Sequence, residues 1–292
     1  AYGRTRAMLK IQDGCNNFCT YCVIPYTRGR IRSLPLEEMA RQAAHLDAEG
    51  YRELVLTGIE IASYGRDLPG KLTLADAVET VAAAAPQMRL RLGSIEPTVI
   101  TEGFCRRAAA TGQVCRHFHL SLPSGCDRTL ARMNRKYNTA EFLACVERLR
   151  RYFPGCALTA DMITGFPGET EADQAAAVAF LEQVGFAAVH VFPYSRRPGT
   201  KADAMPEQLS HAVKSARAHE AQRVADACKQ RYLVQQVGQT LPVLFETEHD
   251  GSWVGHSDNY CLVRAAGDDL RGLVKNVKIS AVSGQMLVGD LV

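Results

Sequence analysis

The chain contains 292 residues, of which 47% are hydrophobic and 22% charged, and its formal net charge is +3. This composition is that of an ordinary soluble globular protein of about two domains. No apolar run approaches the roughly 18 residues of a membrane-spanning helix, so we expect no membrane association. The small net charge does not by itself establish a nucleic-acid partner.

Short apolar runs alternate with amphipathic helical patterns over most of the chain. The pattern predicts six strands, at residues 8–11, 53–57, 89–92, 118–122, 157–163 and 187–192. It predicts helices between them, at residues 35–48, 74–85, 101–110, 139–153 and 171–184. Strands that alternate with helices in this way are typical of a parallel βα array. The predicted fold class is therefore α/β, with a partial TIM-type (βα)6 barrel that carries its chemistry in the loops after the strands.

The character of the sequence changes towards the C-terminus. A long helix rich in Ala, Arg, Gln and Glu is predicted at about residues 210–236. Short β-rich runs follow, separated by Asp-Gly, Gly-Asp and Ser-Gly turns, at residues 241–246, 253–256, 261–264, 273–279 and 286–288. We therefore predict a core at residues 1–230 and a small all-β barrel at residues 231–292.

Three cysteines near the start of the chain, Cys15, Cys19 and Cys22, have the spacing C-x3-C-x2-C. Thiolates are the usual protein ligands of iron–sulfur clusters, and three of them leave the fourth iron of a [4Fe-4S] cluster open to a cofactor or substrate. A structural zinc site would need four ligands, and a disulfide framework belongs to short secreted chains. An oxygen-sensitive cluster indicates a cytoplasmic protein. The other seven cysteines are scattered singly, which is typical of small buried hydrophobic residues.

The cysteine loop resembles the signature loop of the radical S-adenosylmethionine (SAM) enzymes. A closer resemblance, to the methylthiotransferases that modify tRNA, extends through essentially the whole chain. It rests on residues 11–33, which include the string Arg28-Gly-Arg30-Ile-Arg32, and on several later segments. These segments are residues 56–58, 119–122, 124–125, 132–136, 165–170, 190–200 and 254–260.

The resemblance implies a [4Fe-4S] cluster on the three cysteines and SAM bound beside it. The residues that the family would place against SAM are Tyr21, Gly58, Glu60, Glu96, Ser121, Ser124, Ile163 and Gly165. Ile163 and Gly165 match the adenine-contacting strand of the family only in part, because Glu169 is displaced by one position. From residue type alone, Tyr21 also fits a core tyrosine, and Glu60 also fits a solvated loop charge.

Basic residues gather in three places along the chain. Arg28, Arg30 and Arg32 follow the cysteine loop, and Arg196 and Arg197 lie in a later loop. We predict that these five arginines bind RNA phosphates. A further group, at residues 128–136, fits either a basic rim or the solvated surface of a helix. Residues 231–292 hold five Lys/Arg against seven Asp/Glu, so charge gives no support for RNA binding by the small barrel.

The branch of the family that this sequence most resembles acts on threonylcarbamoyladenosine at position 37 of tRNA. The resemblance therefore implies transfer of a methylthio group to carbon 2 of that base. The partners would be the tRNA anticodon stem-loop, an external electron donor and a sulfur source, with the C-terminal barrel holding RNA as a TRAM domain does. The alternatives are the branches that act on isopentenyladenosine of tRNA or on an aspartate of a ribosomal protein, and an RNA-binding module with a structural cluster.

Two departures from the family pattern affect this interpretation. Members normally carry an N-terminal domain with three more cysteines, and that domain is absent from this sequence. We therefore expect the chain to be a fragment of a longer protein. In addition, Pro123 stands where glutamine is usual, so any contact of that glutamine with SAM is lost or replaced.

Overall fold

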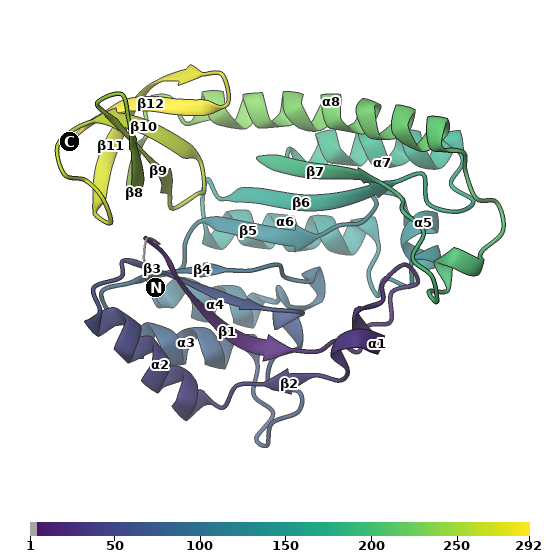
Figure 1. The fold of residues 1–292 in the computed structure, drawn as a ribbon, viewed down its shortest axis with the longest axis horizontal. Coiled ribbons are helices and arrows are strands. Elements are labelled where there is room, and N and C mark those ends of the chain that lie inside the picture. Colours follow the sequence, from purple (N-terminus) through teal and green to yellow (C-terminus); the bar gives the residue numbers. More distant parts are fainter. Residues whose placement is uncertain (1–4) are drawn as a thin grey trace.

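The computed structural model describes residues 5–292. Six parallel strands form the core of the larger part of the chain (Figure 1): β1 (Ala7–Asp13), β3 (Glu53–Gly58), β4 (Arg89–Leu92), β5 (His117–Ser121), β6 (Ala157–Thr164) and β7 (Ala188–Pro193). The main helices are α2 (Leu36–Ala48), α3 (Leu74–Ala84), α4 (Glu102–Ala110), α6 (Thr139–Tyr152), α7 (Glu171–Val184) and α8 (His211–Gln235). All of these strands and helices lie within two residues of their predicted bounds.

The six strands form two three-stranded parallel units that are joined side by side. β1, β3 and β4 are paired in that order, and so are β5, β6 and β7. Single parallel bridges, Leu90 to Val114 and Ile95 to Leu120, connect the two units. No pairing among residues 5–292 joins β7 back to β1. The result is an open barrel of six βα strands, which confirms the predicted (βα)6 fold and leaves a lateral opening between β1 and β7.

The helices cover only the outer face of this half-barrel. Leu9, Ile11, Leu54 and Leu56 point outward into the helix layer and are buried, because alternate residues of a strand face opposite sides. The residues between them, such as Met8 and Lys10, face inward and remain exposed. An inner face that lacks a packed core leaves room for a cofactor and a substrate.

Short elements at the carboxyl ends of the strands were not predicted. They are α1 (Ile24–Arg28), β2 (Arg32–Ser33), α5 (Asp127–Arg132), and the 3-10 turns Ile61–Ser63, Pro97–Val99 and Ala202–Ala204. Both α1 and α5 lie at the end of the half-barrel to which the strand arrows point in Figure 1. Together with the adjoining loops they form the rim in which the cysteine motif sits.

The C-terminal part is a closed five-stranded barrel, which confirms the predicted small barrel. Its strands are β8 (Thr240–His249), β9 (Ser252–Ser257), β10 (Leu262–Ala266), β11 (Val274–Ser283) and β12 (Met286–Leu291). Leu241, Val243, Phe245 and Val263 fill its interior. The predicted boundary at residues 230 and 231 falls within α8, the helix that leads into the barrel, and the division into two domains remains a prediction.

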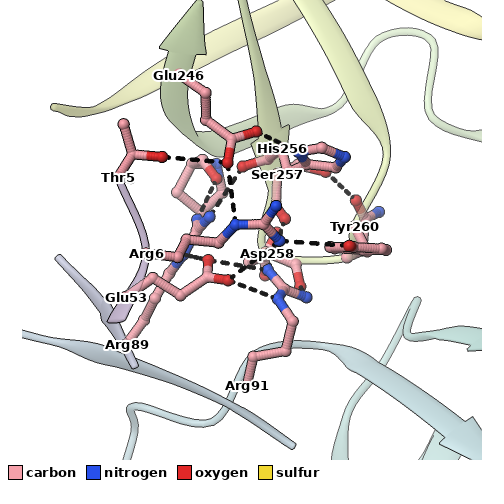
Figure 2. Close-up of polar contacts among 12 residues, drawn as sticks. Thr5, Arg6, Glu53, Arg89, Arg91, Glu246, His256, Ser257, Asp258 and Tyr260 are labelled. Carbon is pink, nitrogen blue, oxygen red and sulfur yellow. Dashed lines mark hydrogen bonds and ion pairs between the residues drawn. The ribbon is translucent and has the colours of Figure 1, made fainter. Parts of the chain in front are cut away.

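The small barrel is attached to the half-barrel at the starts of the strands, at the end away from α1 and α5 (Figure 1), through the polar contacts that Figure 2 shows. Glu53, the first residue of β3, is fully buried and receives hydrogen bonds from Arg89 and Arg91 of β4. The same two arginines donate to the backbone carbonyls of Pro242, His256, Ser257 and Asp258 in the barrel. This network fixes the barrel to the half-barrel.

The helix α8 runs from one end of the molecule to the other. Near its start, Arg217 donates to the Glu169 carboxylate at 2.7 Å, beside the rim. Near its end, the Tyr232 hydroxyl and the Gln236 amide oxygen both accept from the Asn259 amide of the barrel. No helix within residues 5–292 has the length and apolarity needed to cross a membrane.

Candidate functional site

The cysteine loop, residues 14–23, leaves the end of β1 through a tight turn at Gly14. This glycine has a φ of +73°, and a Cβ atom at this position would lie 1.9 Å from the carbonyl oxygen of Arg30. The chain returns past this point, and the amide of Cys15 donates to the Gly29 carbonyl at 3.1 Å. Only glycine fits here, because both the backbone conformation and the close approach exclude a side chain.

Two segments that are distant in sequence hold the loop in place. The Thr20 amide donates to the Met133 carbonyl at 3.1 Å, and the Asn134 side chain donates to the carbonyls of Asn17 and Phe18. The Ala202 amide donates to the Thr20 carbonyl at 2.8 Å. The cysteine loop is therefore anchored through backbone groups, which leaves its thiols available.

The three thiols of this loop are partly exposed, whereas the other seven cysteines are buried. Partial burial raises the pKa of Cys15 to about 11, and the neighbouring Glu60, Cys19 and Cys22 contribute smaller increases. Burial, followed by the proximity of Cys19, also raises the pKa of Cys22. A bound metal group would offset this cost, because metals bind the thiolate form.

The donor set fits a cluster better than a single ion. No three His, Cys, Asp or Glu side chains between residues 5 and 292 are placed to hold one metal ion. In a cubane cluster each cysteine binds a different iron, so three thiols on one loop need not converge on one point. The loop therefore has the ligands and the exposure that a [4Fe-4S] cluster with three protein ligands requires.

Two carboxylates and one guanidinium lie beside the cysteines. The Asn17 amide, in the cysteine loop itself, donates to both Glu60 and Glu96 at 3.2 Å. Burial, reinforced by the charge of Glu96, raises the pKa of Glu60 to about 7. Arg135 donates to the Cys19 sulfur at 3.2 Å, and its Nη2 atom lies 3.2 Å from Glu96.

Each nitrogen of the Arg135 guanidinium has a neighbour within the site, which is Tyr137 for Nε, Cys19 for Nη1 and Glu96 for Nη2. The Arg135 side chain is only 6% exposed, and its guanidinium lies over the Tyr137 ring. The Nη2 atom is buried and is paired with Glu96, although it makes no hydrogen bond of good geometry among the described residues. A guanidinium held between a thiol and a carboxylate is a positive charge that suits an anionic group of a ligand.

An apolar cluster forms the opposite side of the site. Tyr21 and Ile163 pack against the buried side chains of Met133, Phe166 and Tyr194. Tyr21 and Ile163 therefore lie against the same cluster, and their contact with SAM remains a prediction. Burial raises the pKa of Tyr21, so its hydroxyl stays neutral.

Gly165 and Glu169 build a turn after β6. Gly165 has a φ of +70°, and its amide donates to the Glu169 carboxylate at 2.8 Å. Glu169 is buried and is also paired with Arg217 of α8. Glu169, which stands one position later than the acid of the family pattern, therefore accepts from the Gly165 amide and stabilises the turn.

The remaining predicted cofactor residues have different surroundings. Gly58 ends β3 so close to Gln12 that a Cβ atom would lie 2.7 Å from the Gln12 carbonyl oxygen. Ser121 ends β5, and its hydroxyl lies 3.2 Å from that of Ser94. Ser124 is buried, and its hydroxyl accepts from the Cys126 amide. The structure thus places Ser121 at the inner face, whereas Ser124 supports the start of α5.

The five arginines predicted to bind RNA are exposed and lie in α1, in or next to β2, and in the segment that follows β7. Arg32 donates to the carbonyls of Arg28 and Arg30, and so stabilises its own segment. Arg196 pairs with Asp203 at 2.7 Å. Arg28, Arg30 and Arg197 are exposed. Binding of RNA phosphates by the five arginines remains a prediction.

Sequence reasoning missed Arg135 and Asn17 as members of the site. In sequence, Arg135 belongs to the basic group at residues 128–136, which fitted either a rim or a helix surface. In the structure, Arg128 and Arg132 contact the turn after β6, whereas Arg135 points inward. No local signal separates the three arginines, because only tertiary contacts distinguish them.

A family model described as the radical SAM superfamily matches residues 9–181. The chain is 38% identical, over 94% of its length, to the threonylcarbamoyladenosine tRNA methylthiotransferase MtaB of Bacillus subtilis, and covers 62% of that protein. It is 37% identical to the protein of the same name from Chlamydia pneumoniae, over 99% of this chain and 69% of that protein. It is 35% identical to the tRNA-2-methylthio-N(6)-dimethylallyladenosine synthase of Syntrophomonas wolfei, over 98% of this chain and 65% of the relative.

The fold is also similar to that of a solved radical SAM structure. The methyltransferase TsrM of Kitasatospora setae superposes with a TM-score of 0.57 at 18% identity, over 68% of this chain and 38% of TsrM. At that identity the similarity concerns the fold alone. The chain spans about two thirds of the length of the curated relatives that it matches. By its matched segment and its relatives, the chain belongs to the radical SAM superfamily and, within it, to the family of the tRNA methylthiotransferases.

Proposed function

We propose that this chain is the catalytic core of an enzyme that transfers a methylthio group to carbon 2 of threonylcarbamoyladenosine at position 37 of tRNA. The observation that carries the proposal is the rim site. Three partly exposed thiols lie beside an inward-facing guanidinium, two carboxylates and an apolar cluster, all at the carboxyl ends of the strands. Two relatives, at 38% and 37% identity, are named for a threonylcarbamoyladenosine tRNA methylthiotransferase, and this chain covers only part of their length.

The residues of the rim suit a [4Fe-4S] cluster and SAM. Cys15, Cys19 and Cys22 would hold the cluster. The methionine part of SAM carries one ammonium and one carboxylate, so Arg135 suits the carboxylate, while Glu60 and Glu96 suit the ammonium. Tyr21 and Ile163 offer an apolar surface for its adenine. When bound, these cofactors supply a 5′-deoxyadenosyl radical, which can remove hydrogen from a strong carbon–hydrogen bond.

The protein's own contribution is to position the groups and exclude water. Asn17 holds Glu60 and Glu96 next to each other, and Arg135 sets the charge beside Cys19. No side chain is required as a general base, because the hydrogen leaves as an atom. The half-barrel interior, open between β1 and β7, would admit the target base from the side.

The proposed partners follow from the charge of the rim. Arg28, Arg30, Arg32, Arg196 and Arg197 would contact phosphates of the tRNA anticodon stem-loop. The C-terminal barrel, attached at the other end, would act as the TRAM-like RNA-holding domain. An external electron donor and a sulfur source complete the reaction, which we place in the cytoplasm because the cluster is sensitive to oxygen.

Two measurements test the proposal. The chain is reconstituted anaerobically with iron and sulfide and is then given SAM and a reductant, and the expected product is 5′-deoxyadenosine. Cys19→Ala should lose both iron and this product, whereas Cys105→Ala, at a buried cysteine outside the loop, should keep both. If the wild-type protein binds iron but cleaves no SAM, the cluster is structural and the proposal is wrong.

The substrate is tested by mass spectrometry of tRNA nucleosides from a strain that lacks the gene. We expect the methylthio derivative of threonylcarbamoyladenosine to disappear while that of isopentenyladenosine remains. The opposite pattern would assign the chain to the isopentenyladenosine branch instead.

A further inference from the structure

Polar residues line the inner face of the half-barrel just below the rim. The strand register places Ser121, Asp161 and His190 side by side on β5, β6 and β7. Ile163 and Phe192 form the next inward-facing pair towards the rim, and His119 and Thr159 form the pair below. Ile163 belongs to the apolar cluster that we assign to SAM, so the row of Asp161 and His190 lies one layer beneath the proposed cofactor.

The contacts of Asp161 indicate that it is a charged hydrogen-bond acceptor. His119 Nε2 lies 3.5 Å from the Asp161 carboxylate, and its Nδ1 lies 3.0 Å from the Thr159 hydroxyl. A hydrogen bond from His119, and then the charges of His119 and His190, lower the pKa of Asp161. The carboxylate side chain is nevertheless 55% exposed, so it has room for a further donor.

His190 of this row borders an open cavity. The cavity has a volume of about 1480 Å³ and extends from the end of β4 to the small barrel, with His119, Thr159 and His190 in its wall. Phe192 is 52% exposed on the same face of β7 as His190, two residues nearer the rim. A flat ring that entered through the lateral opening could stack on Phe192, and one of its edges would then face Asp161 and His190.

We propose that Asp161 and His190 form the subsite for the group attached to N6 of the target adenosine, and that they select a polar group over an apolar one. This inference rests on the proposed function. A threonylcarbamoyl group offers N–H and O–H donors to Asp161, and a carbonyl and a carboxylate to the imidazole N–H of His190. An isopentenyl group offers none of these, and it would remove Asp161 from water without compensation.

The proposed subsite distinguishes the threonylcarbamoyl base from the isopentenyl base, whereas sequence identity does not decide between them. The relatives named for the two modified bases are 38% and 35% identical to this chain, a difference too small to decide between them. A site that hydrogen-bonds a substrate group rejects an analogue that lacks the group, because its polar groups then lose their partners. The hydrogen-bonding groups of Asp161 and His190 therefore favour the threonylcarbamoyl base, with its carboxylate directed to His190.

Binding of three synthetic anticodon hairpins tests the subsite directly. The hairpins are identical except that the target adenosine carries a threonylcarbamoyl group, an isopentenyl group or no group. Dissociation constants are measured by fluorescence anisotropy with the cluster-loaded full chain under anaerobic conditions. We expect the wild-type protein to bind the threonylcarbamoyl hairpin most tightly, and Asp161→Leu to weaken that binding about tenfold or more.

Matched variants make the result specific to the subsite. Asp161→Leu should leave binding of the unmodified hairpin unchanged, and binding of the isopentenyl hairpin unchanged or tighter. Asp161→Asn and His190→Leu should lower the same preference without loss of the cluster, which is monitored by its visible absorbance. Asp226→Asn, at an exposed aspartate of α8, should have no effect on any hairpin.

Each other outcome overturns a defined part of the inference. If no hairpin binds, the proposed function fails together with the subsite. If the hairpins bind but the Asp161 and His190 variants affect all three equally or not at all, the subsite is wrong and the proposed function stands. If the wild-type protein prefers the isopentenyl hairpin, both the subsite and the choice of branch are wrong.

Discussion

Arg91 and Glu53 form a buried ion pair across β4 and β3, with Arg91 Nε 2.7 Å from Glu53 Oε1. Glu53 also pairs with Arg89 at 2.6 Å, and both arginines continue to carbonyl groups of the C-terminal barrel. One carboxylate thus pairs with two guanidinium groups that together hold the barrel. Such a network is sensitive to loss of its central charge, because each partner left behind is buried.

Replacement of this carboxylate should destabilise the protein strongly. In Glu53→Gln, two buried arginines lose their counter-charge, and we expect the free energy of unfolding to fall by about 3–5 kcal/mol. Denaturant unfolding monitored by Trp253, the single tryptophan, which lies in the barrel, measures the change. Glu38→Gln, which removes an exposed carboxylate paired with Arg41 on α2, is the control and should change little. Equal midpoints for the two variants would contradict the role of Glu53.

The same carboxylate should make stability depend on acid pH. Burial alone would raise the pKa of Glu53, but Arg91 and Arg89 outweigh it and lower the pKa from 4.5 to about 2. Between these values the unfolded chain binds a proton that the folded protein does not, so stability falls as the pH falls from about 4.5 to 2. The loss amounts to about 3 kcal/mol and should be missing from Glu53→Gln. A wild-type acid transition identical in shape to that of the variant would refute this assignment.

Gly14 should be essential for cluster assembly. An alanine there would meet the Arg30 carbonyl and would hold an unfavourable φ, so the cysteine loop could not close. We expect Gly14→Ala to retain little iron after reconstitution. Gly112→Ala is the matched control, because Gly112 has a similar φ of +68° with nothing within 4 Å of the added carbon. Full iron binding by Gly14→Ala would show that the loop can open at this turn.

Arg135 should control binding of SAM more than folding. In Arg135→Met the charge between Cys19 and Glu96 disappears, and a carboxylate-bearing ligand loses a charged partner. We expect about a tenfold or greater loss of SAM affinity, measured by calorimetry on the cluster-loaded protein. Arg151→Met, at an exposed arginine on the outside of α6, is the control. If both variants bind SAM equally well, Arg135 has a structural role only.

The regular elements were predictable because their patterns are local. A short apolar run identified β6, and the capping box of Thr170 and Asp173 marks the start of α7. The short helices α1 and α5 were missed, because five or six residues carry too little periodicity. Their positions depend on contacts such as that between Thr20 and Met133, which join distant parts of the chain.

The site was predictable only as far as residue type indicates chemistry. Cysteine spacing identified Cys15, Cys19 and Cys22, whereas the role of Arg135 depends on which way one arginine of a basic group points. Ser124 shows the converse, because its sequence position suggests a ligand contact while its hydroxyl accepts from the Cys126 amide. Hydrogen-bond partners of this kind are set by tertiary geometry and leave no signal in the sequence.

The single helix α8 connects the rim to the C-terminal barrel, and this limits the insertions and deletions that the helix can accept during evolution. Its 25 residues span roughly 37 Å, and each added residue would advance the barrel by about 1.5 Å and rotate it by about 100°. One insertion before Tyr232 would move its hydroxyl away from the Gly155 carbonyl and carry the barrel carbonyls out of reach of Arg89. Substitutions at the exposed positions of α8 are therefore tolerable, whereas its residue count is fixed by the need to engage both ends at once.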